Sequence, residues 1–299
     1  MKKLFLILSL IVNCQLSIVN SLQAQIPDTD IFLVSMQNDS GKFTFGTPEN
    51  ITNRKGYDNQ PRFDNTVDLL YYVSQPDSTQ TEIYLYNILT KKSFQLTHTP
   101  QSEYSPTPLR DNKHVACVRV DADSSQHLYI YTRSGNFPVN LTPKNDSVGY
   151  FCHIDKSTYA LWVLGKKITL QIFNVDSNKI DTIAINPGRC LQNIPGKFAT
   201  ISYTQKTSDS TWTIMQFESF SKKKTEICKS LIGSEDYAWT PDLKILSGKD
   251  GKLFMYDTKT NEGWKQVADF SKSIGNFYRI AIAAKGKYIA LVGYKGKKP

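Results

Sequence analysis

Ten residues of three chemical types recur in polar segments that each lead into an apolar run. Four are tyrosines, four are acids and two are arginines. Tyrosine, arginine and carboxylate groups together are typical of surfaces that recognise a polar or peptide-like partner. Two acids brought close together would also suit glycoside hydrolysis. The ten candidate binding residues are Tyr57, Asp58, Glu103, Tyr104, Tyr150, Arg189, Glu235, Asp236, Tyr237 and Arg279.

Other catalytic chemistries have less support. A serine hydrolase of the α/β type needs a G-x-S-x-G motif, which the sequence lacks. A metal-dependent enzyme needs several histidines that converge. The four histidines are isolated from one another, and we expect them at the surface or in loops: His98, His114, His127 and His153. We therefore predict no catalytic residue, no metal site and no cofactor.

The elements that must hold the ten residues are β-strands. Short runs rich in Ile, Val, Tyr, Phe and Thr are separated by segments of Asp, Asn, Gly, Ser and Pro. No amphipathic helix is expected after the N-terminal segment. The clearest strands are predicted at 69–74, 83–86, 115–120, 128–131, 159–163, 170–174, 253–256 and 288–292.

These strands recur at a nearly constant interval. Steps of 45, 44, 42, 46 and 41 residues separate the equivalent points Pro61, Pro106, Tyr150, Gln192, Ala238 and Arg279. A period of about 40 to 50 residues, with four short strands in each unit, is the signature of a β-propeller. We therefore predict an all-β chain that forms a six-bladed β-propeller of four-stranded blades.

The last unit is incomplete. It supplies only strands 279–283 and 288–292, whereas the N-terminal strands 31–36 and 49–52 belong to no other unit. An unpaired sheet edge promotes aggregation. We predict that the N-terminal strands complete the last blade and close the ring. The loops that enter the innermost strands then meet at one mouth of the central channel, where we expect the ten candidate residues.

The N-terminal segment has the pattern of a secretion signal. Lys2 and Lys3 precede an apolar run over 4–12, and small Ala24 offers a cleavage site. The run is short for a membrane-spanning helix, which needs about 20 residues. We predict a signal peptide over 1–24, a propeller over 25–299 with a flexible Lys-rich tail at about 295–299, and a periplasmic or secreted location.

The net charge of the chain bears on its partners. Without residues 1–24 the formal net charge falls from +9 to +7, because two lysines and no acids are removed. The lysines are spread along the chain, which is typical of a solvated surface. We predict a monomer without a nucleic-acid partner or a transmembrane segment. Attachment of the tail to an anionic surface such as lipid headgroups stays an alternative.

Four cysteines follow the signal segment, at intervals of 35, 38 and 38 residues. These intervals approach the length of the repeat, so we expect one cysteine on each of four blades. We predict that they are buried free thiols, although export would permit disulfides. The four are Cys117, Cys152, Cys190 and Cys228.

Several short motifs repeat along the chain. Leu96-Thr97, Leu141-Thr142 and Ile51-Thr52 end successive units. Longer stretches are YDNQP (57–61), EYSPTP (103–108), VRVD (118–121), VGY (148–150) and SEDYAWTPD (234–242). Together they resemble an exported bacterial subgroup of the TolB-like β-propeller family. The Ser-Pro-Asp-Gly turn typical of that repeat is not kept in this sequence, and residues 240–242 (Thr-Pro-Asp) are the most similar to it. The resemblance implies a six-bladed periplasmic propeller that binds partners, without the additional N-terminal domain of TolB.

From these features we predict a non-catalytic exported binding or scaffold protein. Its partner, a protein, a peptide or an envelope component, would bind at the channel mouth. The alternative is an enzyme that acts on a carbohydrate or a small polar substrate at the same place.

Overall fold

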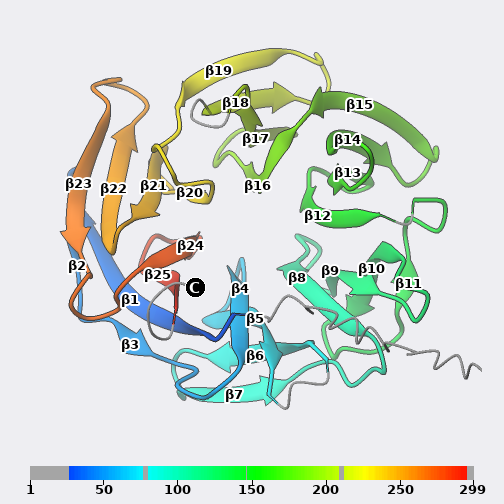
Figure 1. Cartoon of the computed structure of the whole chain (residues 1–299), viewed down its shortest axis with the longest axis horizontal. Coiled ribbons are helices and arrows are strands. Elements are labelled where there is room, and N and C mark those ends of the chain that lie inside the picture. The colour runs from blue at the N-terminus through cyan, green and yellow to red at the C-terminus, as the bar shows by residue number, and fades with distance from the viewer. Residues whose placement is uncertain (1–26, 77–79, 146, 209–211, 295–299) are drawn as a thin grey trace, which may run out of the picture.

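The structure, a computed structural model, describes residues 27–76, 80–145, 147–208 and 212–294 (Figure 1). All regular secondary structure in these ranges is β-strand, which confirms the predicted all-β class. No helix in the described ranges is long and apolar enough to span a membrane. The predicted signal peptide over 1–24 and the tail over 295–299 lie outside the described residues.

Four sheets share one plan, in which four consecutive strands pair antiparallel with their neighbours. Two of these sheets contain β8 (Ser102–Pro108), β9 (His114–Val120), β10 (Gln126–Thr132) and β11 (Val139–Asn140), and β12 (Val148–His153), β13 (Thr158–Val163), β14 (Thr169–Asn174) and β15 (Lys179–Ile185). The other two contain β16 (Pro187–Asn193), β17 (Thr200–Lys206), β18 (Trp212–Glu218) and β19 (Lys224–Lys229), and β20 (Tyr237–Trp239), β21 (Lys244–Lys249), β22 (Lys252–Asp257) and β23 (Trp264–Asp269).

The remaining nine strands form one sheet that includes both ends of the described chain. One part is a further meander of β4 (Tyr57–Phe63), β5 (Leu69–Gln75), β6 (Glu82–Asn87) and β7 (Lys92–Gln95). The other part contains β24 (Phe277–Ile282), β25 (Tyr288–Tyr294), β1 (Thr29–Asp39), β2 (Lys42–Phe45) and β3 (Glu49–Asn50). A single parallel bridge between Thr29 and Tyr57 joins the two parts.

The first strand of the described chain pairs with the last. Strand β1 lies antiparallel to β25, with Thr29 opposite Tyr294 and Ser35 opposite Tyr288. Strand β3 also pairs with β1, at Leu33 and Phe32. The N-terminal strands expected at 31–36 and 49–52 therefore do join the C-terminal ones. The short hairpin strand β2 was not predicted, because its four residues are exposed or half-exposed and carry a weak pattern.

The sheets are arranged around a centre, with the first strand of each meander innermost and the last outermost (Figure 1). The apolar cores lie between neighbouring sheets. Leu128 of β10 packs in one core with Leu161 of β13, and Leu170 of β14 packs in another with Ile201 of β17. Face-to-face packing of small sheets around an axis is typical of a β-propeller.

The repeated Leu-Thr or Ile-Thr dipeptide has a structural role. Each threonine follows the short outer strand of its unit, and its hydroxyl accepts a hydrogen bond from a backbone N–H of the strand beside it. These hydrogen bonds, 2.9 to 3.0 Å long, join Thr52 to Ile31, Thr97 to Ile83 and Thr142 to Leu128. The motif therefore stabilises the end of the outer strand and leaves these hydroxyl groups engaged inside the fold.

The four cysteines of the described residues are buried and free, as predicted. The expectation of one cysteine per blade is wrong, because Cys190 lies on β16 and Cys228 on β19 of the same sheet. That sheet extends from Pro187 to Lys229, so a spacing of 38 residues stays within it.

Candidate binding site in the channel

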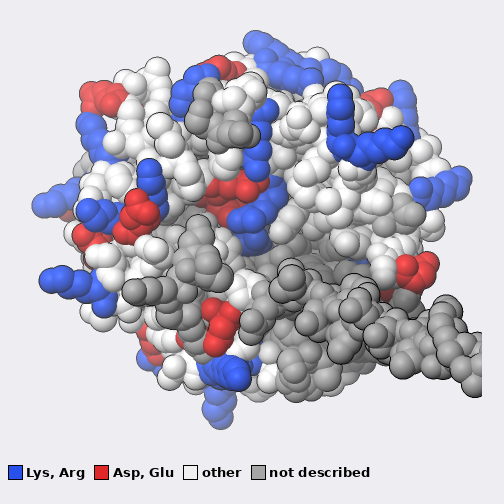
Figure 2. Space-filling view, in the orientation of Figure 1, with Lys and Arg blue, Asp and Glu red and all other residues white. Residues whose placement is uncertain are grey.

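All ten predicted residues lie within the first three positions of an innermost strand or just before it. Tyr57 is the first residue of β4, whereas Tyr150, Arg189 and Arg279 each stand third in β12, β16 and β24. Asp236 directly precedes β20. In Figure 2, basic and acidic side chains meet in the hollow at the centre of the face shown.

A cavity of about 90 Å³ in the channel is lined by these charged side chains. We call it the arginine chamber, because Arg62, Arg189 and Arg279 all line it, together with Asp236 and Ser105. The guanidinium of Arg189 donates a hydrogen bond of 2.6 Å to the carboxylate of Asp236. The Nε atoms of Arg189 and Arg279 are buried without a hydrogen-bond partner among the described residues. The chamber therefore contains donors that the fold itself does not use.

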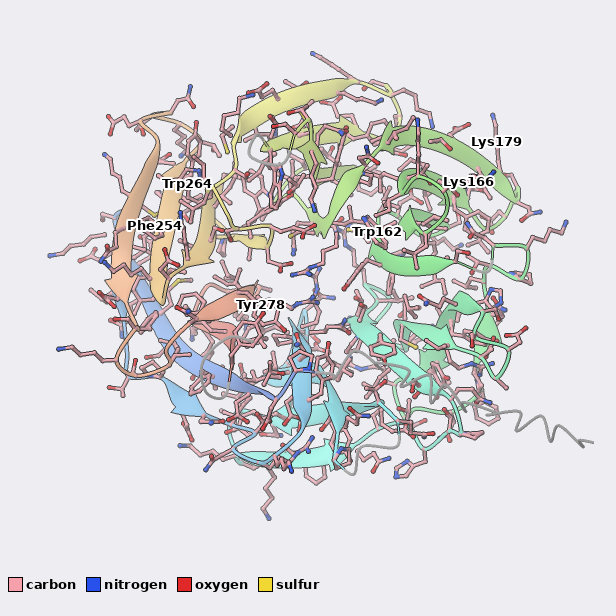
Figure 3. The ribbon with its side chains drawn as sticks, in the orientation of Figure 1. Trp162, Lys166, Lys179, Phe254, Trp264 and Tyr278 are labelled. Carbon is pink, nitrogen blue, oxygen red and sulfur yellow. The ribbon has the colours of Figure 1, made fainter. Side chains whose placement is uncertain are left out.

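Tyrosine rings hold the two guanidinium groups in place. The Cζ atom of Arg279 lies 5.7 Å from the ring centre of Tyr150 and 6.0 Å from that of Tyr278. The Cζ atom of Arg189 lies 5.9 Å from the Tyr278 ring. Tyr278 belongs to β24 and lies toward the centre of the molecule (Figure 3). Because a cation over an aromatic face is attracted without a hydrogen bond, the rings orient the arginines and leave their N–H groups available.

Both rings are fixed by further contacts. Tyr150 packs edge-on against Trp162, with ring centres 5.5 Å apart. Tyr278 stacks on Tyr294 at 4.8 Å, and its hydroxyl accepts a hydrogen bond of 2.5 Å from Asn59. The aromatic surround of the chamber is therefore held in position by contacts within the fold.

The ionisation of the chamber follows from burial and from its neighbours. Burial lowers the pKa of Arg279, but Asp236 and Tyr150 raise it more, so its pKa lies above the ordinary range and the guanidinium stays charged. Burial also raises the pKa of Tyr57 well above its ordinary value, against the effect of Arg279. The Tyr57 hydroxyl is therefore neutral at physiological pH.

Glu235 supports the chamber without lining it. Its carboxylate accepts a hydrogen bond of 2.7 Å from the backbone N–H of Arg189 and lies 3.1 Å from Lys206. Gly188 permits this contact, since a Cβ atom there would lie 2.9 Å from the Cβ of Thr204 and 3.1 Å from Glu235 Oε1. This acid therefore positions the backbone of β16.

Two predicted acids are in the interior. Asp58 and Glu103 are fully buried, and the expected position at the mouth is wrong for both. Asp58 accepts hydrogen bonds of 2.6 Å from Ser74 and from Arg54. Burial raises its pKa to about 6, although these two partners lower it. The acid is thus held inside the first meander.

Glu103 lies between β8 and its neighbours. Its carboxyl accepts hydrogen bonds of 2.5 Å from Thr99 and 3.0 Å from Tyr131. Burial raises the pKa of Glu103 to about 8, the bond from Thr99 opposes the rise, and the nearby carboxyl of Glu82 adds to it. The Glu103 carboxyl, which holds its proton or accepts hydrogen bonds from hydroxyl groups, therefore has a structural role within the sheet.

Tyr237 also lies in the core rather than at the mouth. It is 2% exposed, and its hydroxyl donates a hydrogen bond of 2.9 Å to Ser202. Tyr104 is half-buried and lies near Tyr57, whose pKa it raises. Successive side chains of a strand point to opposite faces, so in neighbouring pairs such as Asp236 and Tyr237 only one residue reaches the channel.

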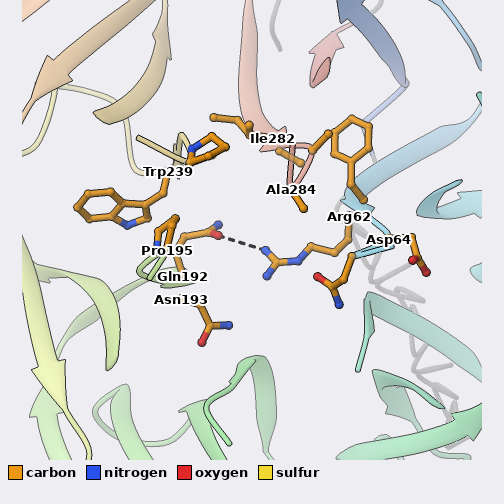
Figure 4. Close-up of a pocket in the computed structure, with 14 residues that line it drawn as sticks. Arg62, Asp64, Gln192, Asn193, Pro195, Trp239, Ile282 and Ala284 are labelled. Carbon is orange, nitrogen blue, oxygen red and sulfur yellow. Dashed lines mark hydrogen bonds between the residues drawn. The ribbon is translucent and has the colours of Figure 1, made fainter. Parts of the chain in front are cut away.

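A second cavity, of about 250 Å³, lies further along the channel and was not predicted (Figure 4). Arg62 reaches across the channel and donates a hydrogen bond of 3.1 Å to Gln192, and both residues line the two cavities. Asn193 and Trp239 are among the other residues that line it. Alternation along β4 and β16 was the only signal for these side chains, and a β-bulge between Asn59 and Arg62 interrupts it.

Two of the four histidines are placed differently from the prediction. His127 and His153 are buried in β10 and β12, and His127 Nδ1 lies 2.8 Å from the carbonyl oxygen of Thr142. His98 is exposed and His114 is half-exposed. In the described part of the chain, no group of three or more His, Cys, Asp and Glu side chains is placed to hold a metal ion.

Comparison with known proteins supports the fold. No protein-family model matches the sequence, and neither does any curated protein sequence. TolB from Acinetobacter baumannii is similar in structure, with a TM-score of 0.57 and 10% identity over 90% of this chain and 65% of that one. This chain therefore spans less than two thirds of that TolB. A putative TolB from Agrobacterium tumefaciens has a TM-score of 0.65 and 10% identity over 91% and 99% of the two chains.

The chain has a TolB-like β-propeller fold. An oligogalacturonate lyase in complex with manganese shares it, with a TM-score of 0.59 and 10% identity over 90% of this chain and 98% of the lyase. At such low identity, likeness shows the fold and leaves the activity open. The described residues of this TolB-like chain do not provide a cluster of ligands for manganese.

Proposed function

We propose that this protein is an exported, non-catalytic binding or scaffold propeller. Its partner, a protein, a peptide or an envelope component, binds at the mouth formed by Tyr57, Tyr150, Arg189, Asp236 and Arg279. The observation that carries the proposal is the convergence of Tyr150, Arg189, Asp236 and Arg279, from or beside separate strands, on one chamber with unused donors. Aromatic and arginine side chains around a buried centre are the usual anchors of protein recognition.

The proposed architecture is a ring of six blades. The nine-stranded sheet divides naturally at its single bridge into the β4–β7 meander and a unit of β24, β25, β1, β2 and β3. Ile31 and Val292 of the latter unit pack in one core with Leu70 of the meander. This packing supports closure of the ring through the pairing of β1 with β25, which would surround the channel on all sides.

Export and oligomeric state complete the proposal. The pattern of residues 1–24 supports a cleaved signal peptide, and hence a periplasmic or secreted protein. We propose that the mature protein acts as a monomer.

Binding is favoured over the enzymatic alternative by the state of the acids. Asp58 and Glu103 are buried and held by hydroxyl or guanidinium donors. Glu235 is held by a backbone N–H, and Asp236 by Arg189. Hydrolysis of a glycosidic bond needs two carboxyl groups that act on the substrate, and these four are already engaged.

The test is capture of partners by the immobilised mature protein (25–299) from an envelope extract of the source cells. The double variant Tyr57→Ala/Tyr150→Ala removes two rings from the mouth, and we expect at least a tenfold loss of captured partner. Lys179→Ala is the matched control, since Lys179 is exposed at the outer edge (Figure 3). Both variants must melt as cooperatively as the parent.

Equal capture by the double variant and the parent would contradict the proposal. Turnover of an added oligosaccharide by the parent, lost in the double variant, would favour the enzymatic alternative.

A further inference from the structure

Three hydrogen-bond donors converge on the arginine chamber without a partner. The Nε atoms of Arg189 and Arg279 and the hydroxyl oxygen of Ser105 are all buried, and none has a hydrogen-bond partner among the described residues. All three residues line the same cavity. Most buried polar groups in folded proteins are hydrogen-bonded, and an unpaired one costs about 1–3 kcal/mol. Three unpaired donors that line one cavity therefore indicate a ligand that accepts hydrogen bonds.

The charge of the chamber indicates the sign of that ligand. Arg62, Arg189 and Arg279 line it with a single carboxylate, that of Asp236, so positive charge is in excess. Asp236 is hydrogen-bonded to Arg189, and Arg62 is bonded to the neutral side chain of Gln192. Water would satisfy the donors but would not offset the charge. An anion does both.

The geometry of the hydrogen-bond donors indicates which kind of anion binds. The Nε–H of an arginine and one of its terminal N–H groups form a planar fork that matches the two oxygens of a carboxylate. The Nε–H donor is unused in both Arg189 and Arg279, although Nη2 of Arg189 also donates to Asp236. A water molecule takes about 30 Å³ in the liquid, so a cavity of about 90 Å³ has room for a two-oxygen group.

We propose that the arginine chamber binds a single carboxylate group, held by Arg189, Arg279 and Ser105. The inference deepens the proposed function, on which it rests, because the chamber lies at the same mouth. Two sources share this chemistry, the side chain of an acidic residue in a partner and a free organic acid. Tyr150 and Tyr278 hold the guanidinium of Arg279 between them and keep the fork aimed before the ligand arrives.

The test is calorimetric titration of the mature protein with sodium acetate in a buffer free of other carboxylates. Acetamide, which has the same shape and no charge, is the control ligand. We expect acetate to bind with a Kd in the millimolar range and acetamide to give no signal. Arg279→Met weakens acetate at least tenfold, and Ser105→Ala weakens it about threefold. Arg110→Met, which alters an exposed arginine outside the chamber, leaves binding unchanged.

Further ligands distinguish the sources and the alternatives. Tighter binding of blocked glutamate (N-acetylglutamate α-amide) than of acetate assigns the chamber to an acidic side chain, and the reverse order assigns it to a free acid. Inorganic phosphate that binds more than tenfold tighter than acetate overturns the carboxylate assignment. Acetate binding that is absent, equal to acetamide or unaffected by Arg279→Met overturns the site itself.

These outcomes are separable from those of the proposed function. If acetate does not bind but envelope partners are still captured through Tyr57 and Tyr150, the mouth is a binding face without a carboxylate site. If acetate binds and capture does not depend on the mouth, the carboxylate site stands and the proposed function fails.

Discussion

The arginine chamber and the surroundings of Glu103 are two buried regions with ionisable side chains on the innermost strands, and they differ in how their hydrogen bonds are satisfied. Around Glu103, the hydroxyl groups of Thr99 and Tyr131 surround the carboxyl. In the chamber, the Nε donors of Arg189 and Arg279 have no partner among the described residues. A buried ionisable group with its partners in place contributes to the fold, whereas a buried charge with unused donors indicates a site for a ligand.

The largest expected effect is a loss of folding stability when Glu103 is replaced. Glu103→Ala leaves a cavity and removes the acceptor of the Thr99 and Tyr131 hydroxyls, so we expect the free energy of unfolding to fall by about 3 kcal/mol. Urea unfolding of the mature protein measures it. Glu226→Ala, at an acid whose side chain is 53% exposed, is the control and changes stability by about 0.5 kcal/mol or less. Equal losses in the two variants would contradict a structural role for Glu103.

The pH dependence of stability gives the next effect. The folded-state pKa of Glu103 is raised from an ordinary 4.5 to about 8, chiefly by burial, so the folded protein holds this proton more tightly than the unfolded chain does. Its contribution to stability is therefore complete at low pH. It is lost as the pH rises from 4.5 to about 8, at up to about 1.4 kcal/mol per pH unit.

Glu103→Gln removes this titration. We expect its unfolding free energy to vary less with pH than that of the parent, in urea titrations at pH 5, 6, 7 and 8. Asp58, with a pKa raised by burial to about 6 from 3.8, contributes a slope of the same sign at lower pH in both proteins. Parallel curves for variant and parent would show that Glu103 does not titrate in this range.

A smaller loss of stability is expected when the contact of Glu235 with the backbone of β16 is disturbed. In Gly188→Ala, the new methyl group would lie 2.9 Å from Thr204 and 3.1 Å from Glu235, so we expect a loss of about 1 to 2 kcal/mol and weaker acetate binding. Gly165→Ala is the control, since the nearest atom to its Cβ is 3.5 Å away. Thermal melts and acetate titrations of both variants measure the two effects. Undiminished acetate binding in Gly188→Ala would mean that Glu235 does not position Arg189.

The smallest effect on stability is expected at the buried charge of Arg279. Arg279→Met replaces a buried charge that has no ion-pair partner among the described residues, while Asp236 keeps Arg189. The attraction of Asp236, which raises the pKa of Arg279, opposes the cost of burying the charge, so we expect stability to change by about 1 kcal/mol or less. Urea unfolding at pH 7 checks it. A loss as large as that of Glu103→Ala would place Arg279 among the structural residues.

Much of the fold was readable from the sequence because strands have a local pattern. The predicted strands at 69–74, 115–120 and 288–292 lie within β5, β9 and β25. The repeat also indicated that residues 31–36 pair with the C-terminal strand, since an unpaired edge is unfavourable. The cysteine spacing led to the wrong prediction of one cysteine per blade, because 38 residues also separate Cys190 and Cys228 on the inner and outer strands of one sheet.

The site was predicted in part, and the errors have one physical cause. Polar segments at strand starts indicated where Arg189 and Arg279 lie. The side on which a residue such as Asp58 or Glu103 emerges depends on strand register and on bulges, which composition does not reveal. Arg62 and Gln192 were missed for the same reason, since register shifts after Asn59 in β4 and after Pro187 in β16 reset the alternation of these strands.

The most direct test of the central claim is NMR observation of the arginine Nε–H groups of the ¹⁵N-labelled mature protein during an acetate titration. Assignments come from Arg189→Lys and Arg279→Lys. We expect the Nε–H signals of Arg189 and Arg279 to shift together and saturate, while that of Arg110 does not move and the Glu103→Gln variant behaves as the parent. Signals of Arg189 and Arg279 that stay fixed, or that move no more than that of Arg110, would contradict it.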